Sequence, residues 1–465
     1  MPKKKTALTI EERLQQALVP VEEQPYEVPE NWVWVRLGNF IDLLRGVSYK
    51  KHDVHNEKME NDCLILRGGN IIEGGLDLNA DNVYVDKSLV SEAQLIRKND
   101  IIIVSSTGSV KVIGRAGLAF YDYNDVAFGA FLTLARPKNG CNKSFVDLFF
   151  QSFLYRQSIR ELASGVNINN IRSEYITNMT FPLPPLSEQQ RIVERIEELF
   201  AKLDEAKERL QEAADSFAVR KAAILHKAFT GELTKQWRWE NGVSDESWEE
   251  KKLGEVGSWL GGGTPSTSRE EYWENGNILW ITSKDMKSAV IEDTLMKVNE
   301  IGVKNSSANY IEKPALLVVM RSGILRRTFP VAMVKKPFTV NQDLKAIIPD
   351  KDDLEFLYWM LLSNEQRILD TCMKNGTTVE SINSNALKNL TFKCPTLPEQ
   401  HEIVRLIDDL LARERAAQQA AEQALASIDL MKKSILARAF RGELGTNKAS
   451  EASALELLRQ VLAEN

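Results

Sequence analysis

The chain has 465 residues, of which 43% are hydrophobic and 27% are charged, and its formal net charge is -6. This length exceeds what one hydrophobic core usually supports, so we expect two or more domains. No apolar run approaches the roughly 20 residues of a membrane helix, and the start of the sequence lacks the apolar core of a signal peptide. These features argue against membrane and secreted proteins and predict a cytoplasmic one.

Cysteine and histidine residues do not form a recognisable site in the sequence. The cysteines stand singly, without C-x-x-C spacing, and are Cys63, Cys141, Cys372 and Cys394. We interpret them as reduced, isolated thiols. His52 and His55 have a spacing that could hold a metal on a helix, but no second ligand pair lies nearby in the sequence. We therefore interpret them as polar loop residues and predict no metal site.

The first half of the chain is expected to begin with a short amphipathic helix within residues 1–28, where the sequence reads TIEERLQQALV. Residues 29–183 combine β-branched segments such as IIIVSS with Gly and Asn turns, and carry the helical segment VDLFFQSFLYRQSIRELA near their end. This pattern predicts a globular domain of strands and helices. Residues 184–233 predict a long helix that begins at a Pro-containing turn and ends near Gly231.

The second half repeats this order. A linker over residues 234–244 leads to a second globular domain over 245–394, a second long helix over 395–444, and a helical tail over 445–465 that contains ALELLRQVLAEN. We expect the two terminal helical segments to lie near each other. The predicted fold class is mixed α/β (α+β), with two globular domains separated by two long antiparallel coiled-coil helices.

Both long helices carry apolar residues at alternating spacings of four and three, which is the heptad pattern of a coiled coil. The residues expected in this seam, between the helices or against a partner subunit, are Ile192, Ile196, Leu199, Leu203, Leu210, Phe217, Ile403, Ile407, Leu410 and Ile428. Antiparallel pairing about a pseudo-two-fold axis would place the globular domains at opposite ends. The alternative is a plain helical hairpin that supports two ordinary domains.

The two halves are copies of each other. FPLPPLSEQQRIV (Phe181–Val193) returns as FKCPTLPEQHEIV (Phe392–Val404), and KAAILHKAFTGEL (Lys221–Leu233) returns as KKSILARAFRGEL (Lys432–Leu444). Near the start of each copy, PENWVWVRLG and DESWEEKKLG share Glu, Trp, Leu and Gly in register. The chain is therefore a tandem duplication.

No catalytic centre is predicted from the sequence. The chain lacks a G-x-x-x-x-G-K-[ST] phosphate loop, a G-x-S-x-G elbow and an H-E-x-x-H motif. Acidic residues gather in helical segments such as EELFAKLDEAKERLQEAAD, which is typical of a solvated helix face. Because the globular parts are closer to charge balance, the negative net charge of the whole chain does not exclude a nucleic-acid partner.

Polar and basic loops that contain glycine recur at matching positions in the two copies. They read RGVSYKK, SSTGSVKV and SGVNINNIR in the first copy, and GGGTPST, RSGILRR and NGTTVESIN, with NQD nearby, in the second. Such loops offer Arg and Lys to guanine edges and phosphates, Asn and Gln to adenine, and glycine where the backbone approaches a DNA strand. The alternative is that each loop is a solvated turn. The candidate DNA-binding residues are Arg45, Lys50, Lys51, Ser106, Lys111, Asn167, Asn169, Arg321, Arg326, Arg327, Asn341, Gln342, Lys374 and Thr377.

The doubled P-L-x-E-Q-x-x-I-V pattern and the doubled A-F-x-G-E-L helix end resemble those of the specificity subunits of Type I restriction-modification enzymes, over nearly the whole chain. The resemblance implies that each globular domain is a target recognition domain that reads one half of a split, asymmetric DNA sequence. It implies that the long helices act as spacers, and that the doubled motif is the hinge between each recognition domain and its helix. It also implies a chain without a catalytic centre of its own.

The partners implied by this resemblance are double-stranded DNA, two modification (methyltransferase) subunits and two restriction (translocase and nuclease) subunits, which together carry out adenine-N6 methylation and restriction. S-adenosylmethionine would belong to the modification subunits, and ATP with Mg²⁺ to the restriction subunits, so this chain is expected to bind no cofactor. The competing hypothesis is a non-catalytic coiled-coil scaffold with two domains that bind partners other than DNA. An independent enzyme ranks below both.

Overall fold

In the computed structural model, the chain divides into two units. The first unit contains residues 1–210 and 424–465, and the second contains residues 211–423. The residues that the structure describes are 9–109, 111–165, 170–374 and 379–464. Within these ranges, no helix has both the length and the apolar character needed to cross a membrane.

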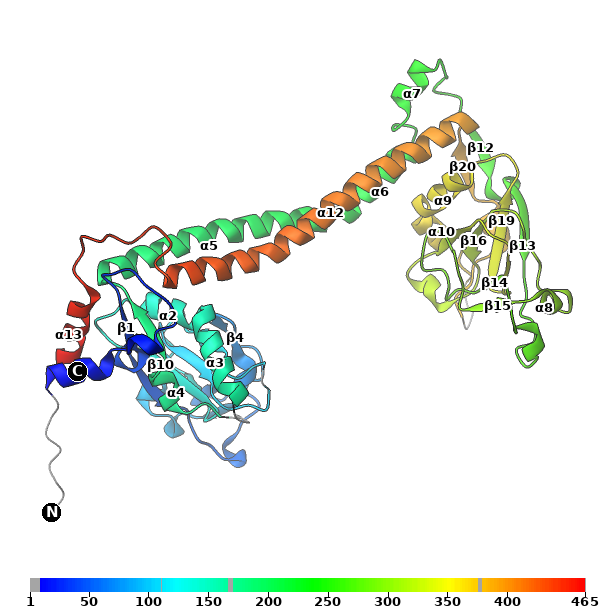
Figure 1. The fold of residues 1–465 in the computed structure, drawn as a ribbon. Coiled ribbons are helices and arrows are strands. Elements are labelled where there is room, and N and C mark those ends of the chain that lie inside the picture. Colours follow the sequence, from blue (N-terminus) through cyan, green and yellow to red (C-terminus); the bar gives the residue numbers. More distant parts are fainter. Residues whose placement is uncertain (1–8, 110, 166–169, 375–378, 465) are drawn as a thin grey trace. The chain divides into compact units, whose positions relative to one another are not determined.

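The first unit combines small sheets with helices (Figure 1). Its strands are β1 (Val33–Arg36), β2 (Ile41–Arg45), β3 (Asp62–Leu66), β4 (Ile71–Ile72), β5 (Gly75–Leu76), β6 (Tyr84–Asp86), β7 (Ile101–Val104), β8 (Ala116–Leu118), β9 (Val126–Phe128), β10 (Leu132–Pro137) and β11 (Thr180–Leu183). Its α-helices are α1 (Ile10–Ala17), α2 (Lys143–Gln151), α3 (Phe153–Gly165), α4 (Ser173–Thr177), most of α5 (Leu186–Asp215), the end of α12 (Leu397–Phe440), and α13 (Ala454–Glu464). The sheet orders are β2-β10-β7-β8, β6-β3-β9, β1-β11 and β4-β5.

The second unit has the same plan. Its strands are β12 (Glu249–Lys252), β13 (Gly257–Gly261), β14 (Ile278–Ile281), β15 (Met296–Val298), β16 (Ala315–Val319), β17 (Val331–Val334), β18 (Phe338–Val340), β19 (Leu344–Pro349) and β20 (Thr391–Cys394). Its further α-helices are α6 (Phe217–Phe229), α7 (Lys235–Glu240), α8 (Glu300–Lys304), α9 (Leu354–Ser363), α10 (Glu365–Cys372) and α11 (Ser384–Lys388). The orders β13-β19-β16-β17, β15-β14-β18 and β12-β20 match three sheets of the first unit strand for strand, which confirms the predicted duplication and the mixed fold class.

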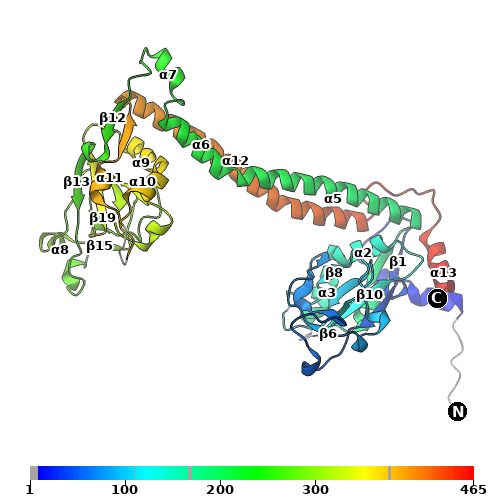
Figure 2. The same ribbon diagram turned by 180° about the vertical axis from the view of Figure 1, so that it is seen from behind.

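Each unit buries its own apolar core beside its larger sheet. In the first unit, α2 contacts β8, and Phe145, Phe149 and Phe181 form edge-to-face ring pairs. In the second unit, α9 contacts β16 and β17 and buries Phe356 completely. Figure 2 shows α2 and α3 beside the strands of the first unit. The apolar runs that were expected as strands are buried on both faces, because helices or the second sheet cover them.

The two long helices differ in continuity. The second is one helix, α12, whereas the first is interrupted between α5 and α6 at Ser216. The Ser216 hydroxyl donates to the carbonyl oxygen of Ala213 at 2.7 Å. A serine that bonds back to the preceding turn competes with the helical backbone and bends it. Expecting one unbroken helix over residues 184–233 was therefore wrong, and the segment expected as a linker, 234–244, itself contains α7.

The long helices run antiparallel where they pair. In the first unit, Lys432 lies 2.6 Å from Asp204. Asp429, three residues before Lys432, lies 3.9 Å from Lys207, three residues after Asp204. In the second unit, the Arg220 Nε lies 2.7 Å from a Glu414 oxygen. Glu414, the charged residue that interrupts the second heptad seam, is therefore matched by an arginine of α6. Antiparallel pairing of the heptad helices is confirmed.

The expected seam is only partly a helix-to-helix surface. Its first positions are buried in the globular cores: Ile192 and Ile196 in the first unit, Ile403 and Ile407 in the second. Ile428 is also buried. Those that remain half-buried are Leu199, Leu203, Leu210, Phe217 and Leu410. The buried isoleucines in the first three turns of each helix therefore anchor a globular domain, whereas Leu186 and Leu397, in the first turns, stay exposed.

A buried glutamate anchors the start of α5. Glu188 is fully buried and accepts hydrogen bonds from the Trp32 indole at 2.7 Å, from the Asn447 amide at 2.8 Å and from the Thr446 hydroxyl at 3.3 Å. One side chain thus connects the residue before β1, the first turn of α5 and the segment that follows α12. A buried carboxylate is tolerated when several donors replace its lost water.

The counterpart of this glutamate in the second copy is Glu399. It is also fully buried, and accepts from the Thr234 hydroxyl at 2.7 Å and from the Arg238 guanidinium at 2.8 Å. Its other oxygen and the indole N–H of Trp248, the counterpart of Trp32, are buried without a hydrogen-bond partner in the described part of the chain. These two atoms correspond to the bonded pair Trp32–Glu188 of the first unit.

The glutamine that follows each glutamate ties the helix start to a second helix. Gln189 accepts from the backbone N–H of Asn142 at 2.8 Å and donates to the Pro184 carbonyl oxygen at 2.9 Å. Gln400 accepts from the backbone N–H of Asp353 at 2.8 Å and donates to the Pro395 carbonyl oxygen. Asn142 and Asp353 are the N-caps of α2 and α9. The doubled Glu-Gln motif is therefore a pair of structural junctions.

The terminal helical segments meet in the first unit, as expected. α1 contacts α13, and Leu14, Leu458 and Val461 share one buried cluster. The guanidinium of Arg191 on α5 makes two bonds of 2.8 Å to the Glu451 carboxylate. The two ends of the chain are thereby bound to the same helix start that Glu188 anchors.

The first stability prediction concerns Arg238, which is 6% exposed. Arg238→Met leaves the Glu399 carboxylate buried with one ionic partner fewer, and should cost about 3–5 kcal/mol of unfolding free energy. Replacing both residues by methionine should restore most of that loss. Denaturant unfolding measures both variants. Arg209→Met is the control, since its ion pair with Glu205 is exposed and should change stability by less than about 0.5 kcal/mol. An Arg238→Met variant with an unchanged unfolding free energy would contradict the role of Arg238 in stabilising the buried Glu399.

The second prediction concerns pH. Burial raises the pKa of Asp147, on α2, from 3.8 to about 7. Since the folded chain keeps this proton and the unfolded chain releases it, stability is highest below the unfolded pKa and falls as the pH rises through about 7. Asp147→Asn should remove this decline, which develops between the unfolded pKa and about pH 7 and is on the order of 4 kcal/mol. Melting temperatures from pH 4 to pH 8 would measure it. Glu197→Gln, on the exposed face of α5, should leave the decline in place.

Candidate nucleic-acid interface

The strand registers gather the candidate loops of the first unit at one end of its sheets. Arg45 of β2 pairs with Thr133, and Val104 of β7 pairs with Leu132, so both strands end where β10 begins. β3 ends at the same level, since Leu66 pairs with Phe128 in parallel. The segments that follow β2, β3 and β7 and the segment that precedes β10 therefore share one end.

Main-chain hydrogen bonds fix this end of the first unit. The carbonyl oxygen of Phe131 accepts from the backbone N–H groups of Ser105 and Ser106, at 3.1 and 3.0 Å. Ile171 donates its N–H to the Ser105 carbonyl oxygen at 2.7 Å, and Asn170 forms a bridge with Ser106. Three loops are thereby joined by main-chain bonds, to which the Ser105 hydroxyl adds a bond of 3.0 Å to the Phe131 carbonyl oxygen.

The same frame occurs in the second unit. The carbonyl oxygen of Asp343 accepts from the N–H groups of Met320 and Arg321, at 2.8 and 3.3 Å. Ile382 donates to the Met320 carbonyl oxygen at 2.8 Å, and Ser381 forms a bridge with Arg321. We call these two sets of bonded loops the loop frame of each unit.

Equivalent positions of the two loop frames carry different chemistry. Ser106 corresponds to Arg321, and Phe131 corresponds to Asp343, because they make the same main-chain bonds. A hydroxyl is thus exchanged for a guanidinium, and an aromatic ring for a carboxylate. Two frames of the same geometry offer different functional groups to whatever lies against them.

Two glycines of the candidate loops, Gly46 and Gly262, serve the fold. A Cβ on Gly46 would lie 2.1 Å from the carbonyl oxygen of Gly129, and one on Gly262 would lie 1.8 Å from that of Val340. Each glycine stands where the first strand of the larger sheet crosses onto the smaller sheet. At these two positions the close backbone approach expected for a DNA strand is made to the protein's own strand.

The candidate residues of the first unit are mostly accessible. Arg45, Lys50, Lys51 and Lys111 are exposed, and Ser106 is half-buried. Ser106 lies within the loop frame, whereas Arg45 and Lys50 belong to the segment that follows β2. Asn167 and Asn169 lie outside the described residues.

Most candidate residues of the second unit have exposed side chains, and some of these already bond a neighbouring side chain. Arg321, Arg326, Arg327, Gln342 and Lys374 are exposed, and Thr377 lies outside the described residues. Arg326 forms an ion pair with Glu380 and holds the pKa of that carboxyl below its ordinary value. The Gln342 amide oxygen accepts from the Thr264 hydroxyl at 2.8 Å.

Asn341 has a structural role in the second frame. Its side chain is buried, and its amide oxygen accepts from the Asp343 backbone N–H at 3.2 Å. Its amide nitrogen lies 3.3 Å from an Asp343 carboxylate oxygen. These bonds, and the burial of the side chain, give Asn341 a role in the turn before β19, and its contact with an adenine edge stays a prediction.

Three further residues lie at this end: Tyr49, which belongs to the candidate loop RGVSYKK, and Arg67 and Phe131, which lie outside the candidate loops. With Ser106 and Thr107 they line a cavity of about 380 Å³ in the first unit. The repeat offered a signal for Phe131, because GAF at 129–131 stands at the positions of NQD at 341–343. Arg67 follows a strand outside the compared loops, so nothing in the repeat pointed to it.

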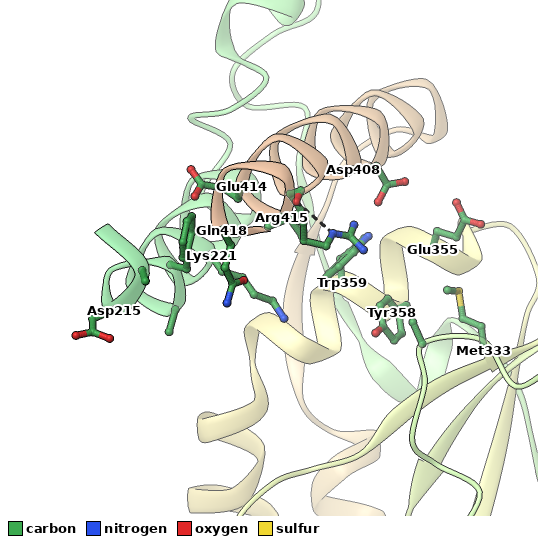
Figure 3. Close-up of a pocket in the computed structure, with 15 residues that line it drawn as sticks. Asp215, Lys221, Met333, Glu355, Tyr358, Trp359, Asp408, Glu414, Arg415 and Gln418 are labelled. Atoms are coloured by element: carbon green, nitrogen blue, oxygen red, sulfur yellow. Dashed lines mark hydrogen bonds between the residues drawn. The ribbon is translucent and has the colours of Figure 1, made fainter. Parts of the chain in front are cut away.

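A larger cavity, of about 730 Å³, lies in the second unit between α6, α12, α9 and β17. Figure 3 shows Asp408 and Arg415 of α12 on the side of Glu355 and Trp359 of α9. Burial, and next the negative charge of Glu355, raise the pKa of Asp408. This cavity lies along the helix pair, apart from the loop frame of the second unit.

His, Cys, Asp and Glu side chains do not gather into a metal site in the described part of the chain. Among the described residues, no group of three or more His, Cys, Asp or Glu side chains could hold a metal ion. The His55 Nδ1 lies 2.8 Å from an oxygen of the buried Asp62. The cysteines are all buried and unpaired as disulfides.

Comparison with known families matches both halves of the chain. The model of the Type I restriction modification DNA specificity domain matches residues 29–214 and again residues 245–424. Each match begins before the first strand of a recognition domain and extends into the long helix that follows it. The family model thus reproduces the repeat that the sequence shows.

Curated relatives and solved structures agree with this match. The chain is 29% identical to the EcoKI specificity subunit of Escherichia coli, covering 94% of this chain and 96% of that one, and 29% identical to the StySPI specificity subunit of Salmonella potsdam over the same shares. The crystal structure of the HsdS subunit from Thermoanaerobacter tengcongensis shares the fold, with a TM-score of 0.63 at 20% identity, over 91% of this chain and 100% of that chain. The chain therefore belongs to the family of Type I restriction-modification specificity subunits, whose role is the recognition of a DNA sequence.

Proposed function

We propose that this chain reads an asymmetric, two-part DNA target, with one half-site for the loop frame of each unit. The observation that carries the proposal is the pair of frames with equal main-chain bonds and unlike side chains, Ser106 against Arg321 and Phe131 against Asp343. A guanidinium recognises guanine and a carboxylate accepts from cytosine, whereas a hydroxyl and a ring favour other edges. Two such frames would select two different sequences.

The chain would act through partner subunits. We propose that it directs two modification subunits to methylate adenine at N6, and two restriction subunits to cleave unmodified DNA. S-adenosylmethionine would be held by the modification subunits, and ATP with Mg²⁺ by the restriction subunits. The half-buried positions of the helix pair, such as Leu203 and Leu210, are the surface we assign to the modification subunits.

The direct test is methylation sequencing of DNA from cells that produce this chain together with the modification subunit encoded beside it. A split methyladenine motif should appear only when this chain is present, with unlike half-sites. Cells that carry the modification subunit alone are the control. A functional modification subunit that gains no motif from this chain would favour the scaffold hypothesis.

Arg321 provides a sharper prediction. Arg321→Ala should cost about 1–3 kcal/mol of binding to the preferred target and relax one position of the second half-site, leaving the first half-site unchanged. Methylation sequencing reports the relaxation, and titration of labelled duplex reports the affinity. If Arg321 contacts only a phosphate, the affinity for all sequences should fall alike. The slope of log affinity against log salt concentration should then fall by about one.

Lys313→Ala is the matched control for this prediction. Lys313 is exposed and precedes β16, whereas Arg321 follows that strand, so the two cations lie at opposite ends of it. The control should retain both the motif and the affinity. Equal effects of the two substitutions would contradict the assignment of recognition to the loop frame.

A further inference from the structure

The first unit has a cavity beside its loop frame. The cavity of about 380 Å³ at this end is lined by Val47, Tyr49, Leu66 and Ala130, of which Tyr49 and Ala130 are accessible. Its polar lining includes Ser106, Thr107, and the ion pair of Arg67 with Asp81, whose atoms are 2.9 Å apart. An apolar recess beside polar groups can accept a small apolar group carried on a polar molecule.

Phe131 lines this cavity and is held in an exposed position. It is 70% exposed, although its carbonyl oxygen is fixed by Ser105 and Ser106. A single exposed phenylalanine is ordinary on a protein surface. Here the ring stands on a fixed main chain, next to a recess, at the position where the second unit places Asp343. These three circumstances together distinguish Phe131 from the other exposed apolar residues.

The chemistry of the ring limits what it can read. Phenylalanine has no hydrogen-bond donor or acceptor, and the 5-methyl group of thymine is the apolar group that base pairs present in the major groove. A ring inserted between base pairs would instead act through unstacking, without requiring that methyl group. The recess beside Phe131 favours the methyl group, because it provides apolar walls around a volume next to the ring.

We propose that Phe131, with the recess lined by Tyr49 and Ala130, is a specificity-determining site that binds the 5-methyl group of a thymine in the first half-site. This inference rests on the proposed function, since it requires that the first unit reads DNA. The corresponding position of the second unit, Asp343, lacks an apolar side chain and reads no methyl group.

The test uses the chain in complex with its modification subunits and duplexes that carry the full target. Each thymine of the first half-site is replaced in turn by deoxyuridine, which removes only the methyl group. For the unmodified chain, one replacement should weaken binding about fourfold, the effect of one buried methyl group. For Phe131→Ala, the same replacement should have no effect, whereas Phe131→Leu should retain part of it.

Phe120→Ala is the matched control. Phe120 is 54% exposed and follows β8, whose Leu118 pairs with Ile101 at the start of β7, so it lies at the opposite end of the sheet. This variant should keep the full deoxyuridine effect. Circular dichroism and the unchanged motif of the second half-site would show that Phe131→Ala is folded.

Three results would overturn the inference: a first half-site without thymine, no methyl dependence in the unmodified chain, or an equal deoxyuridine effect in Phe131→Ala. Weaker binding of Phe131→Ala to thymine and deoxyuridine duplexes alike would assign the ring to unstacking. In each of these cases, sequence-specific binding by the unmodified chain would leave the proposed function intact. Absence of any sequence-specific binding would instead refute the proposed function itself.

Discussion

Two buried carboxylates, those of Glu188 and Glu399, determine which segments pack at the start of each long helix. A fully buried carboxylate must be surrounded by donors, and the donors come from segments far apart in the chain. Trp32 stands before the first strand and Asn447 follows the last long helix, yet both donate to Glu188. Satisfying one charge therefore fixes the entry to the recognition domain, the start of the long helix and the segment after the opposite long helix.

The two units meet this requirement with different covalent connections. In the second unit, Thr234 and Arg238 belong to the segment that continues directly into β12, so their approach to Glu399 is assisted by chain connectivity. In the first unit, the equivalent segment after α12 has no covalent link to β1. Packing of α1 against α13 and the Arg191–Glu451 ion pair supply the connection instead. In the first unit, contacts of the terminal helices thus hold the segments that the covalent chain connects in the second unit.

The sequence was informative where a repeat or a period imposed a pattern. The duplication, the mixed fold and the antiparallel helices all follow from motifs that recur at equal spacing or from heptads. It was less informative where one side chain decided the outcome. Ser216 interrupts a strong helical pattern through one hydroxyl bond. Gly46 and Gly262 look like the glycines of a ligand loop, although backbone crossing between sheets requires them.

The prediction of individual site residues was limited for the same reason, because single side chains decide the outcome. Loops at equal positions in both copies could be recognised, but the roles of individual side chains depend on burial that the sequence does not reveal. Asn341 and Gln342 are adjacent and both amides, yet the first is buried in its turn and the second is exposed. Phe131 was missed because an apolar residue before a strand is most simply assigned to the core.

The loop frames explain how one fold can carry two recognition chemistries. Their bonds join main-chain N–H and carbonyl groups, so replacing Ser106 by arginine or Phe131 by aspartate leaves the groups that form these main-chain bonds in place. A side chain that points away from a fixed backbone costs little stability when it changes. The buried glutamates, in contrast, cannot change without leaving donors unpaired. The division between the two kinds of position separates what the fold must keep from what recognition is free to vary.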